Sequence, residues 1–346
     1  MRGKTITYAK SRLEKSLVDY FSDKHTDVID KRVFVLKGDI TKIGFELSNK
    51  EYSQLSKNLD AIIHTAAIVK YYGGYSDFEK VNVFGTQNVA DFALDNNLPM
   101  FYVSTMGLAG QHFAGQAILD NAFSENDLYP EQIYEHNMYI KSKYEAEKLI
   151  NRYISHGLQA AIFRVGNLTG RYSDGHFQTN IGENYFYNVL KSILSIGAIS
   201  DNILNTKFDF TPVDICSKAI VDLAFTDNCL GSNFHVLNPH MVSVNKLLKL
   251  LNLLDIHIKT LKKVDFDILI KNLSVDDNIK LNGIVNDLNT EYQLDFGKNV
   301  KISSDFSVDY LKRIGFNWPA IDKEYIQKLI TYMQKVKFID LLCKVG

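Results

Sequence analysis

Short apolar segments alternate along this chain with longer segments whose apolar residues recur at helical spacing. The apolar segments cover residues 33–36, 61–64, 100–104, 159–165 and 233–237, and helical spacing marks 8–22, 77–97, 136–156, 183–197 and 213–226. Uninterrupted apolar strands that alternate with helices are typical of a parallel sheet covered on both faces. The pattern therefore predicts an α/β fold with a doubly wound parallel sheet.

Polar or small residues follow four of these predicted strands. They are Asp39, the run Thr65-Ala66-Ala67, the pair Ser104-Thr105, and the pair Gly166-Asn167. Ligands of open α/β sheets bind outside the carboxyl ends of the strands, so we expect these residues to share one functional edge.

Composition excludes several classes of function. The chain has 346 residues, 46% of them hydrophobic, with 39 basic and 40 acidic residues. No run of Lys or Arg exceeds two residues, which argues against a nucleic-acid partner, and no apolar run approaches the ~20 residues of a membrane span. Three scattered cysteines and histidines without ligand spacing predict no metal site. We therefore expect a soluble cytoplasmic protein.

The chemically most informative pattern is Tyr139 and Lys143, preceded by Ser104-Thr105. Residues four apart share one face of a helix, and a nearby ammonium favours the phenolate form of a tyrosine, which lowers the phenol's pKa. Such a phenol can give a proton to a carbonyl oxygen while a nicotinamide gives hydride to its carbon. The alternative is a solvated Tyr–Lys pair. Of the two hydroxyls, Thr105 is expected to orient the substrate oxygen, and Ser104 to satisfy a backbone group.

The other strand-end residues allow two interpretations each. Asp39 either accepts a hydrogen bond from an adenine amino group or caps a turn. The Thr65-Ala66-Ala67 turn either lets backbone approach a cofactor or packs tightly against a helix. Asn82 lies inside a predicted helix, where Asn is unfavourable, and either ties backbone groups near the site or faces solvent.

The order and spacing of several short segments resemble the extended short-chain dehydrogenases. These segments are Gly38-Asp39-Ile40, His64-Thr65-Ala66-Ala67, Asn82-Val83-Phe84-Gly85-Thr86, Val103-Ser104-Thr105 and Tyr139-Ile140-Lys141-Ser142-Lys143. The stretch 164–175, with Phe177-Gln178 and Asn180 after it, is more specific and is similar to the terminal thioester reductase domains of nonribosomal peptide synthetases. Residues 210–214 and 234–238 fit the same family.

This resemblance implies a Rossmann-like NADP-binding domain over residues 1–238, with a substrate loop and helix at 171–204, and a smaller, mostly helical domain over 239–346. It implies NADPH-dependent reductive release of a peptidyl or acyl thioester from a phosphopantetheine carrier protein, within a larger synthetase of secondary metabolite biosynthesis. The product is an aldehyde or, after a second reduction, an alcohol. The C-terminal helical domain would form the channel for the pantetheine arm.

Residue by residue, the resemblance makes Thr105, Tyr139 and Lys143 catalytic. Lys143 would also hold the ribose of the cofactor. The implied cofactor contacts are Arg2, Asp39, Ile40, Thr65, Ala66, Ala67, Asn82, Ser104, Lys143, Gly166 and Asn167. The implied substrate contacts are Met106, Arg171, Tyr172, Phe177 and Gln178.

The chain departs from the family pattern at its beginning. Relatives start with a strand, a glycine-rich loop, a helix and a second strand that often ends in Arg, whereas here Arg2 takes the place of that arginine and no G-x-G-x-x-G motif occurs. A phosphate-binding helix N-terminus is thereby lost, so we expect a fragment of a longer polypeptide with impaired cofactor binding. The alternatives are a carboxylic acid or fatty acyl reductase domain, and a non-catalytic fragment that only docks carrier protein.

Overall fold

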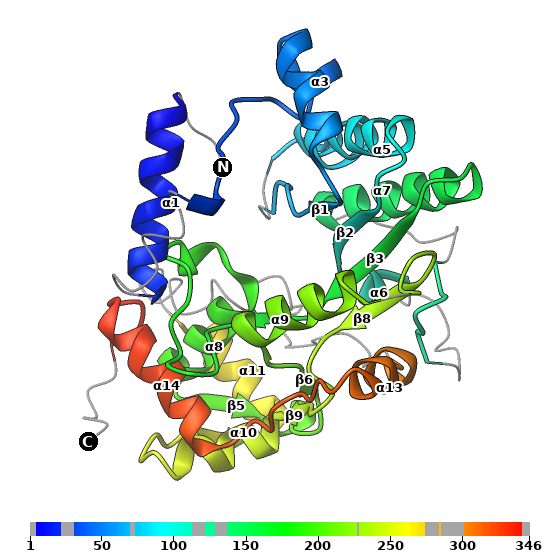
Figure 1. Ribbon diagram of the computed structural model, residues 1–346. Coiled ribbons are helices and arrows are strands. Elements are labelled where there is room, and N and C mark those ends of the chain that lie inside the picture. The colour runs from blue at the N-terminus through cyan, green and yellow to red at the C-terminus, as the bar shows by residue number, and fades with distance from the viewer. Residues whose placement is uncertain are drawn as a thin grey trace.

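The computed structural model describes residues 5–21, 31–69, 73–112, 122–128, 137–226, 228–273, 284 and 301–340. Arg2 of the predicted site lies outside these ranges. Figure 1 shows a central sheet with helices on both sides and a second group of helices at one end.

The centre of the fold is a four-stranded parallel sheet with the order β1-β2-β3-β8. Its strands are β1 (Ile62–His64), β2 (Met100–Thr105), β3 (Ala160–Val165) and β8 (Asn233–Val236). The register pairs Met100 with Ala160, and Thr105 with Val165. Because all four strands run the same way, their carboxyl ends meet at one edge, as the sequence predicts.

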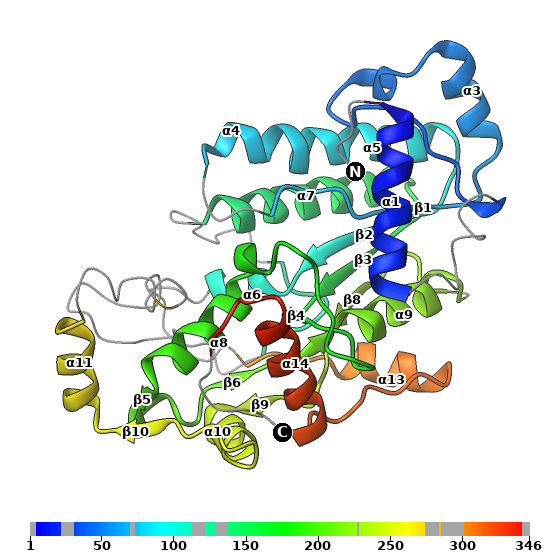
Figure 2. The ribbon, with the colours of Figure 1, turned by 90° about the vertical axis from the view of Figure 1, so that its left-hand side faces the viewer.

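Helices cover both faces of this sheet. One face carries α4 (Tyr75–Phe78), a π-helical segment (Glu79–Phe84), α5 (Gly85–Asp95) and α7 (Met138–Ser155), which Figure 2 shows stacked above the strands. The other face carries α9 (Val213–Ala224) and α13 (Asp305–Arg313). Alternation along β2 sends Met100 and Tyr102 into the core beneath α5 and α7, and Phe101 into the core beneath α9. The doubly wound α/β fold is confirmed.

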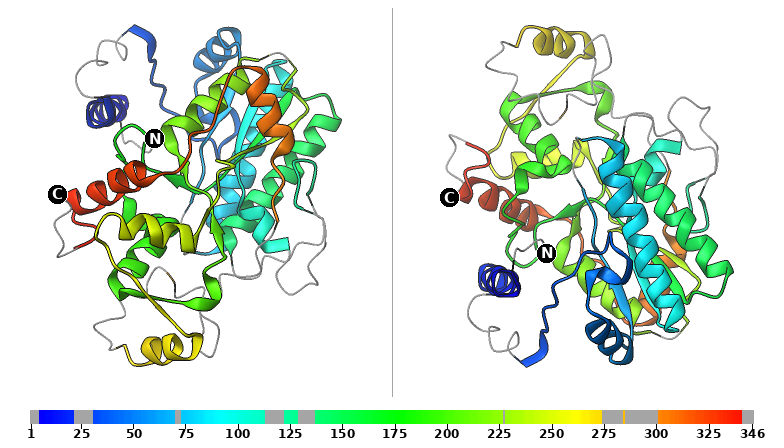
Figure 3. Two further views of the ribbon diagram at one scale, coloured as in Figure 1. Left: turned by 90° about the horizontal axis from the view of Figure 1, so that it is seen from below. Right: turned by 90° about the horizontal axis from the view of Figure 1, so that it is seen from above.

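A second lobe is built around a separate apolar core. It contains α8 (Tyr185–Ile196), α10 (Val244–Asn252), α11 (Lys263–Lys271) and α14 (Lys323–Lys335), with α11 at its far end (Figure 3). Three short strand pairs accompany these helices: β4 (Leu168–Thr169) with β7 (Thr211–Pro212), β5 (Ala198–Ser200) with β10 (Lys259–Leu261), and β6 (Lys207–Phe208) with β9 (Val242–Ser243).

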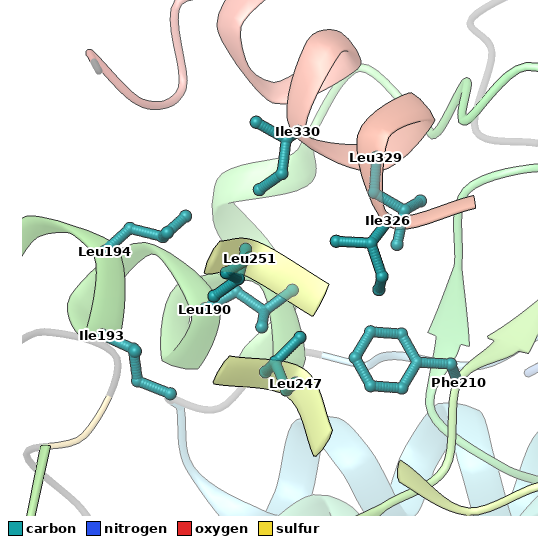
Figure 4. Close-up of a pocket in the computed structure, with 9 residues that line it drawn as sticks. All are labelled: Leu190, Ile193, Leu194, Phe210, Leu247, Leu251, Ile326, Leu329 and Ile330. Atoms are coloured by element: carbon teal, nitrogen blue, oxygen red, sulfur yellow. The ribbon is translucent and has the colours of Figure 1, made fainter. Parts of the chain in front are cut away.

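The core of this lobe joins residues from both sides of position 238. Side chains of α8, α10 and α14 converge with Phe210 on a small apolar pocket whose cavity volume is only about 10 Å³ (Figure 4). The pocket lining contains no polar or ionisable side chain, so it offers no group for proton transfer. In contrast, α13 packs on the sheet and shares a core with β8 and α9.

Within the described ranges, the remaining helices are short or lie at the periphery. They are α1 (Ile6–Phe21), α3 (Asn49–Lys57), α6 (Gly107–His112) and three 3₁₀ turns at Ile43–Glu46, Ile181–Glu183 and Asp201–Ile203. Figure 1 shows α1 away from the sheet, with one end near α14.

The strand predicted at residues 33–36 is wrong. The segment is irregular, and the side chains of Phe34 and Leu36 are 87% and 49% exposed. An apolar run becomes a strand only when a neighbouring strand satisfies its N–H and C=O groups. Among the described residues, this segment pairs with no strand, and β1 pairs only with β2. The turn that follows does form, because the Asp39 N–H donates to the Phe45 carbonyl.

Candidate active site

The first two turns of α7 carry the predicted phenol and ammonium. The helix begins after Asn137, whose side-chain oxygen accepts a hydrogen bond from the Ile140 N–H at 3.1 Å, so an Asn N-cap fixes where the helix starts. Tyr139 is half-buried, whereas Lys143, one turn later, is only 4% exposed. The two residues therefore lie on one helical face that looks toward the sheet.

The end of β2 lies close to the first turn of α7. Thr105 is its last residue, and its Oγ1 accepts a hydrogen bond from the Gly107 N–H at 3.1 Å. A Cβ at Gly107 would come within 2.4 Å of Ile140 Cδ1, so a larger residue at this position would require the Ile140 side chain to move. The loop that carries Thr105 is thereby held beside Tyr139. Met106, a predicted substrate contact, is buried in the small core between them.

At the end of β2 the hydroxyl that binds a backbone group is that of Thr105, and not that of Ser104 as expected. Ser104 is buried, and within the described residues its Oγ has no hydrogen-bond partner, while Thr105 is the one that binds a backbone N–H. The reason is that successive side chains of a strand point to opposite faces of the sheet. Ser104 lies on the face that α7 covers, whereas Thr105 is the last residue of β2, where the chain turns toward α6. An unpaired buried hydroxyl at a strand end remains able to bind a ligand.

The ammonium of Lys143 is held by two neutral oxygens of β2. Nζ donates to the Val103 carbonyl at 2.8 Å and to Tyr102 Oη at 3.2 Å. Burial lowers the pKa of Lys143 to about 8, and the carboxylate of Glu147, one turn along α7, acts in the opposite direction. Burial also raises the pKa of Tyr102 well above its usual value, so this phenol stays neutral.

Asn82 ties the loop after β1 to α7. It is 1% exposed, accepts from the Ile68 N–H at 2.7 Å, and donates to the Ile68 carbonyl at 3.0 Å and to Ser142 Oγ at 2.8 Å. Ser142 in turn donates to the Tyr139 carbonyl at 2.7 Å. Of the two interpretations of Asn82, the structure favours the tie between backbone groups. The π-helical segment around it explains why Asn is accommodated inside a helix.

The residues after the first two predicted strands occupy different surroundings. Asp39 accepts a hydrogen bond from the Thr41 N–H at 2.9 Å, which holds the pKa of its carboxyl below the usual range, and thus it caps its own turn. Ile40 packs against α5, where its carbonyl accepts from Asn88 Nδ2. The Thr65-Ala66-Ala67 turn follows β1, and its first two residues are exposed.

Gly166 and Asn167 meet a buried carboxyl group. Asp209 accepts hydrogen bonds from the Asn167 N–H at 2.6 Å, from Asn167 Nδ2 at 2.7 Å and from Thr211 Oγ1 at 3.0 Å. A Cβ at Gly166 would lie 2.0 Å from Asp209 Oδ2. Burial raises the pKa of Asp209 despite these donors. In this arrangement the Asn167 amide serves the protein's own structure.

The predicted substrate residues at 171–178 lie in the second lobe. Arg171 forms an ion pair with Asp174 and donates to the carbonyl of Tyr20 at the end of α1. Tyr172 stacks on Tyr325, Phe177 is buried in the core of the lobe, and Gln178 is exposed. None of these contacts reaches Tyr139 or Lys143 among the interactions of the described residues.

Sequence reasoning missed Tyr102. It lies in the apolar run Met100-Phe101-Tyr102-Val103, which reads as an ordinary core strand. The usable signal is register: Tyr102 stands two residues before Ser104 and therefore shares the sheet face that α7 covers.

The chain is similar to several known proteins. The sequence model of the male sterility protein family, an NAD-binding family, matches residues 1–220. A solved thiolation-reductase di-domain from an archaeal nonribosomal peptide synthetase is 30% identical, with a TM-score of 0.83 over 98% of this chain and 70% of that one.

Two curated relatives are much longer than this chain. A linear gramicidin synthase polypeptide of Brevibacillus parabrevis is 26% identical over 94% of this chain, and a carboxylic acid reductase of Segniliparus rugosus is 28% identical over 69% of it. The chain spans 6% and 21% of their respective lengths. Within the described ranges, no helix combines the length and apolar character needed to cross a bilayer.

Proposed function

We propose a thioester reductase function from one premise: this chain belongs to the male sterility protein family, and it has the Rossmann-like extended short-chain dehydrogenase fold of synthetase reductase domains. The proposed reaction is the NADPH-dependent release of a peptidyl or acyl group, as an aldehyde, from its thioester with a carrier protein. The observation that carries it is the arrangement of Thr105, Tyr139 and Lys143 at the carboxyl edge of the sheet.

The residues of the strand edge suit a nicotinamide cofactor. Ser104 offers a buried hydroxyl without a partner among the described residues, and Ala66, one of the small residues after β1, is exposed. Lys143 uses two of its three N–H donors within the protein. When bound, the nicotinamide supplies hydride to the thioester carbon.

The protein groups supply the proton and the orientation. Thr105 donates a hydrogen bond to the thioester oxygen, and Tyr139 transfers its phenolic proton to that oxygen as the carbon receives hydride. Lys143 stabilises the phenolate that remains. The resulting hemithioacetal then breaks its C–S bond, the hydroxyl proton passes to the leaving sulfur, and aldehyde and thiol are released.

The finer assignments rest on the relatives. NADPH, rather than NADH, is proposed from the family resemblance and from Arg2. A carrier-protein partner is proposed because one similar structure joins a thiolation domain to its reductase domain. A carboxylic acid reductase domain is the second candidate, favoured by the relative from Segniliparus rugosus. It shares the reduction step and differs in the acyl group delivered.

The test is a titration of the purified chain with NADPH, followed by turnover of an acyl-pantetheine thioester. Saturable binding, weaker for NADH, together with aldehyde formation supports the proposal. Tyr139→Phe should lower kcat by about 10²-fold or more, because the positioned acid is lost. Tyr153→Phe, a matched loss of a hydroxyl farther along α7, should leave turnover unchanged. Equal activity of Tyr139→Phe and wild type would overturn the mechanism.

A further inference from the structure

A buried chain of polar groups runs beneath the proposed catalytic pair. Lys143 donates to Tyr102 Oη at 3.2 Å, and its Nζ lies 4.6 Å from the centre of the Tyr102 ring. The ring of Tyr102 lies 5.6 Å, centre to centre, from that of His64, whose Nε2 is 2.9 Å from the Thr86 hydroxyl. These polar groups come from β1, β2, α5 and α7, so they lie where the helices pack on the sheet.

The two acceptors of the Lys143 ammonium have a chemical property in common. The Val103 carbonyl and the Tyr102 phenol are both neutral, so they hold the ammonium in place without neutralising its charge. A carboxylate in the same position would form an ion pair and reduce the field that reaches Tyr139. Two anchored N–H groups also fix the direction of the third, for which the described residues provide no partner.

We propose that Tyr102 is a positioning residue for the reductase chemistry, whose phenol oxygen, together with the Val103 carbonyl, orients the Lys143 ammonium toward the ligand side of the site. The inference rests on the proposed function and extends it by one residue. Tyr102 touches neither substrate nor cofactor in this scheme and acts only through Lys143.

The groups that face the Lys143 ammonium come from three elements. On β1, His64 is buried and its pKa is lowered to about 4, so it is neutral. On β2, Tyr102 is a neutral phenol. On α7 the neighbours are Tyr139, one turn before, and Glu147, one turn after, whose carboxylate is bound to Arg164. Among these, Tyr102 is the only side chain that accepts a hydrogen bond from Nζ.

The test compares Tyr102→Phe with Tyr153→Phe in two measurements. The first follows the titration of Lys143 by NMR of lysine labelled with ¹³C at Cε, assigned with Lys143→Arg. Loss of an acceptor for a charged donor should lower the Lys143 pKa by about one unit in Tyr102→Phe, which is a roughly tenfold loss of the charged form at pH values above the wild-type pKa of about 8. Tyr153→Phe should leave this titration unchanged.

The second measurement is the pH profile of kcat with an acyl-pantetheine thioester. In Tyr102→Phe the pKa that governs the fall of kcat at high pH should decrease by the same amount as the Lys143 pKa measured by NMR. Looser packing of the core alone would not make the two shifts equal. An unchanged Lys143 titration would overturn the inference. Absence of turnover in the wild-type chain would overturn the proposed function, whereas the NMR titration would still report on the Tyr102 contact.

A second variant covers the case in which Tyr102→Phe does not fold. Site-specific 3-fluorotyrosine at position 102 keeps the ring and the hydroxyl but makes the oxygen a weaker acceptor. It should shift the Lys143 titration in the same direction as Tyr102→Phe and by less, and a shift in the opposite direction would refute the contact.

Discussion

The ion pair between Arg164 and Glu147 is fully buried, and its disruption should strongly destabilise the fold. Both side chains are 0% exposed, with Arg164 Nη2 2.8 Å from Glu147 Oε2 and Nε 3.1 Å from the same oxygen. The remaining Arg164 nitrogen, Nη1, is 3.2 Å from His235 Nε2, and burial together with the Arg164 charge lowers the pKa of His235 to about 4. A neutral His235 accepts from Arg164 and cannot compensate its charge.

Glu147→Gln keeps the shape of the side chain and removes the negative charge. Loss of one partner of a buried ion pair costs about 3–5 kcal/mol, because the other charge stays buried without compensation. The matched control is Asp222→Asn, which removes one partner of the partly exposed pair with Lys218 and should cost less than about 1 kcal/mol. Urea unfolding followed by circular dichroism measures both values.

The double variant Glu147→Leu with Arg164→Met tests the physical reason for the cost. When both charges are replaced by apolar groups, most of the lost stability should return, since desolvation of the ions is no longer required. A loss below about 1 kcal/mol for Glu147→Gln, or a double variant less stable than the single one, would refute the argument.

Three further predictions concern the site. Turnover should fall as pH rises through about 8, because Lys143 loses its proton there, and the pH profile of kcat measures this. The free energy of unfolding should rise between pH 8 and 10.5, because in that range the unfolded chain binds more protons than the folded one. Urea midpoints measured across this range check the direction. Gly166→Ala should destabilise the folded protein by about 1–3 kcal/mol, because the added Cβ would clash with Asp209. The control is Gly182→Ala, whose Cβ would meet only one atom within 4 Å, at 3.8 Å. Its stability in thermal unfolding should be within about 1 kcal/mol of the wild type. Asn82→Ala should increase amide exchange of the loop after β1, and unchanged exchange at Ile68 would contradict its role as a tie.

The sequence pattern predicts the sheet well, because buried parallel strands must be apolar and must end where the chain turns. The strands at 100–104 and 159–165 and the long helix that follows Asn137 form close to where their periodicity places them. Periodicity succeeds there because each element meets a partner that satisfies its backbone and covers its apolar face.

The segment at 33–36 shows where periodicity is insufficient. Its composition is that of a strand, yet strand formation depends on a neighbour, and neighbours are a property of the whole fold. The hydroxyls of Ser104 and Thr105 differ for a similar reason, since one peptide unit decides which of them faces the turn. The register of Tyr102 with Ser104 indicates which face of the sheet it occupies, but not its hydrogen bond with Lys143, which is 41 residues away in sequence.

Asn82 has a mechanical consequence. By holding the backbone of Ile68 on one side and the hydroxyl of Ser142 on the other, it joins the loop after β1 to the first turns of α7 as a single rigid body. A ligand that displaces that loop would carry the backbone of Tyr139 with it, because Ser142 is bonded to the Tyr139 carbonyl. Ligand binding at the end of β1 and the orientation of the Tyr139 proton donor near the end of β2 would then change together.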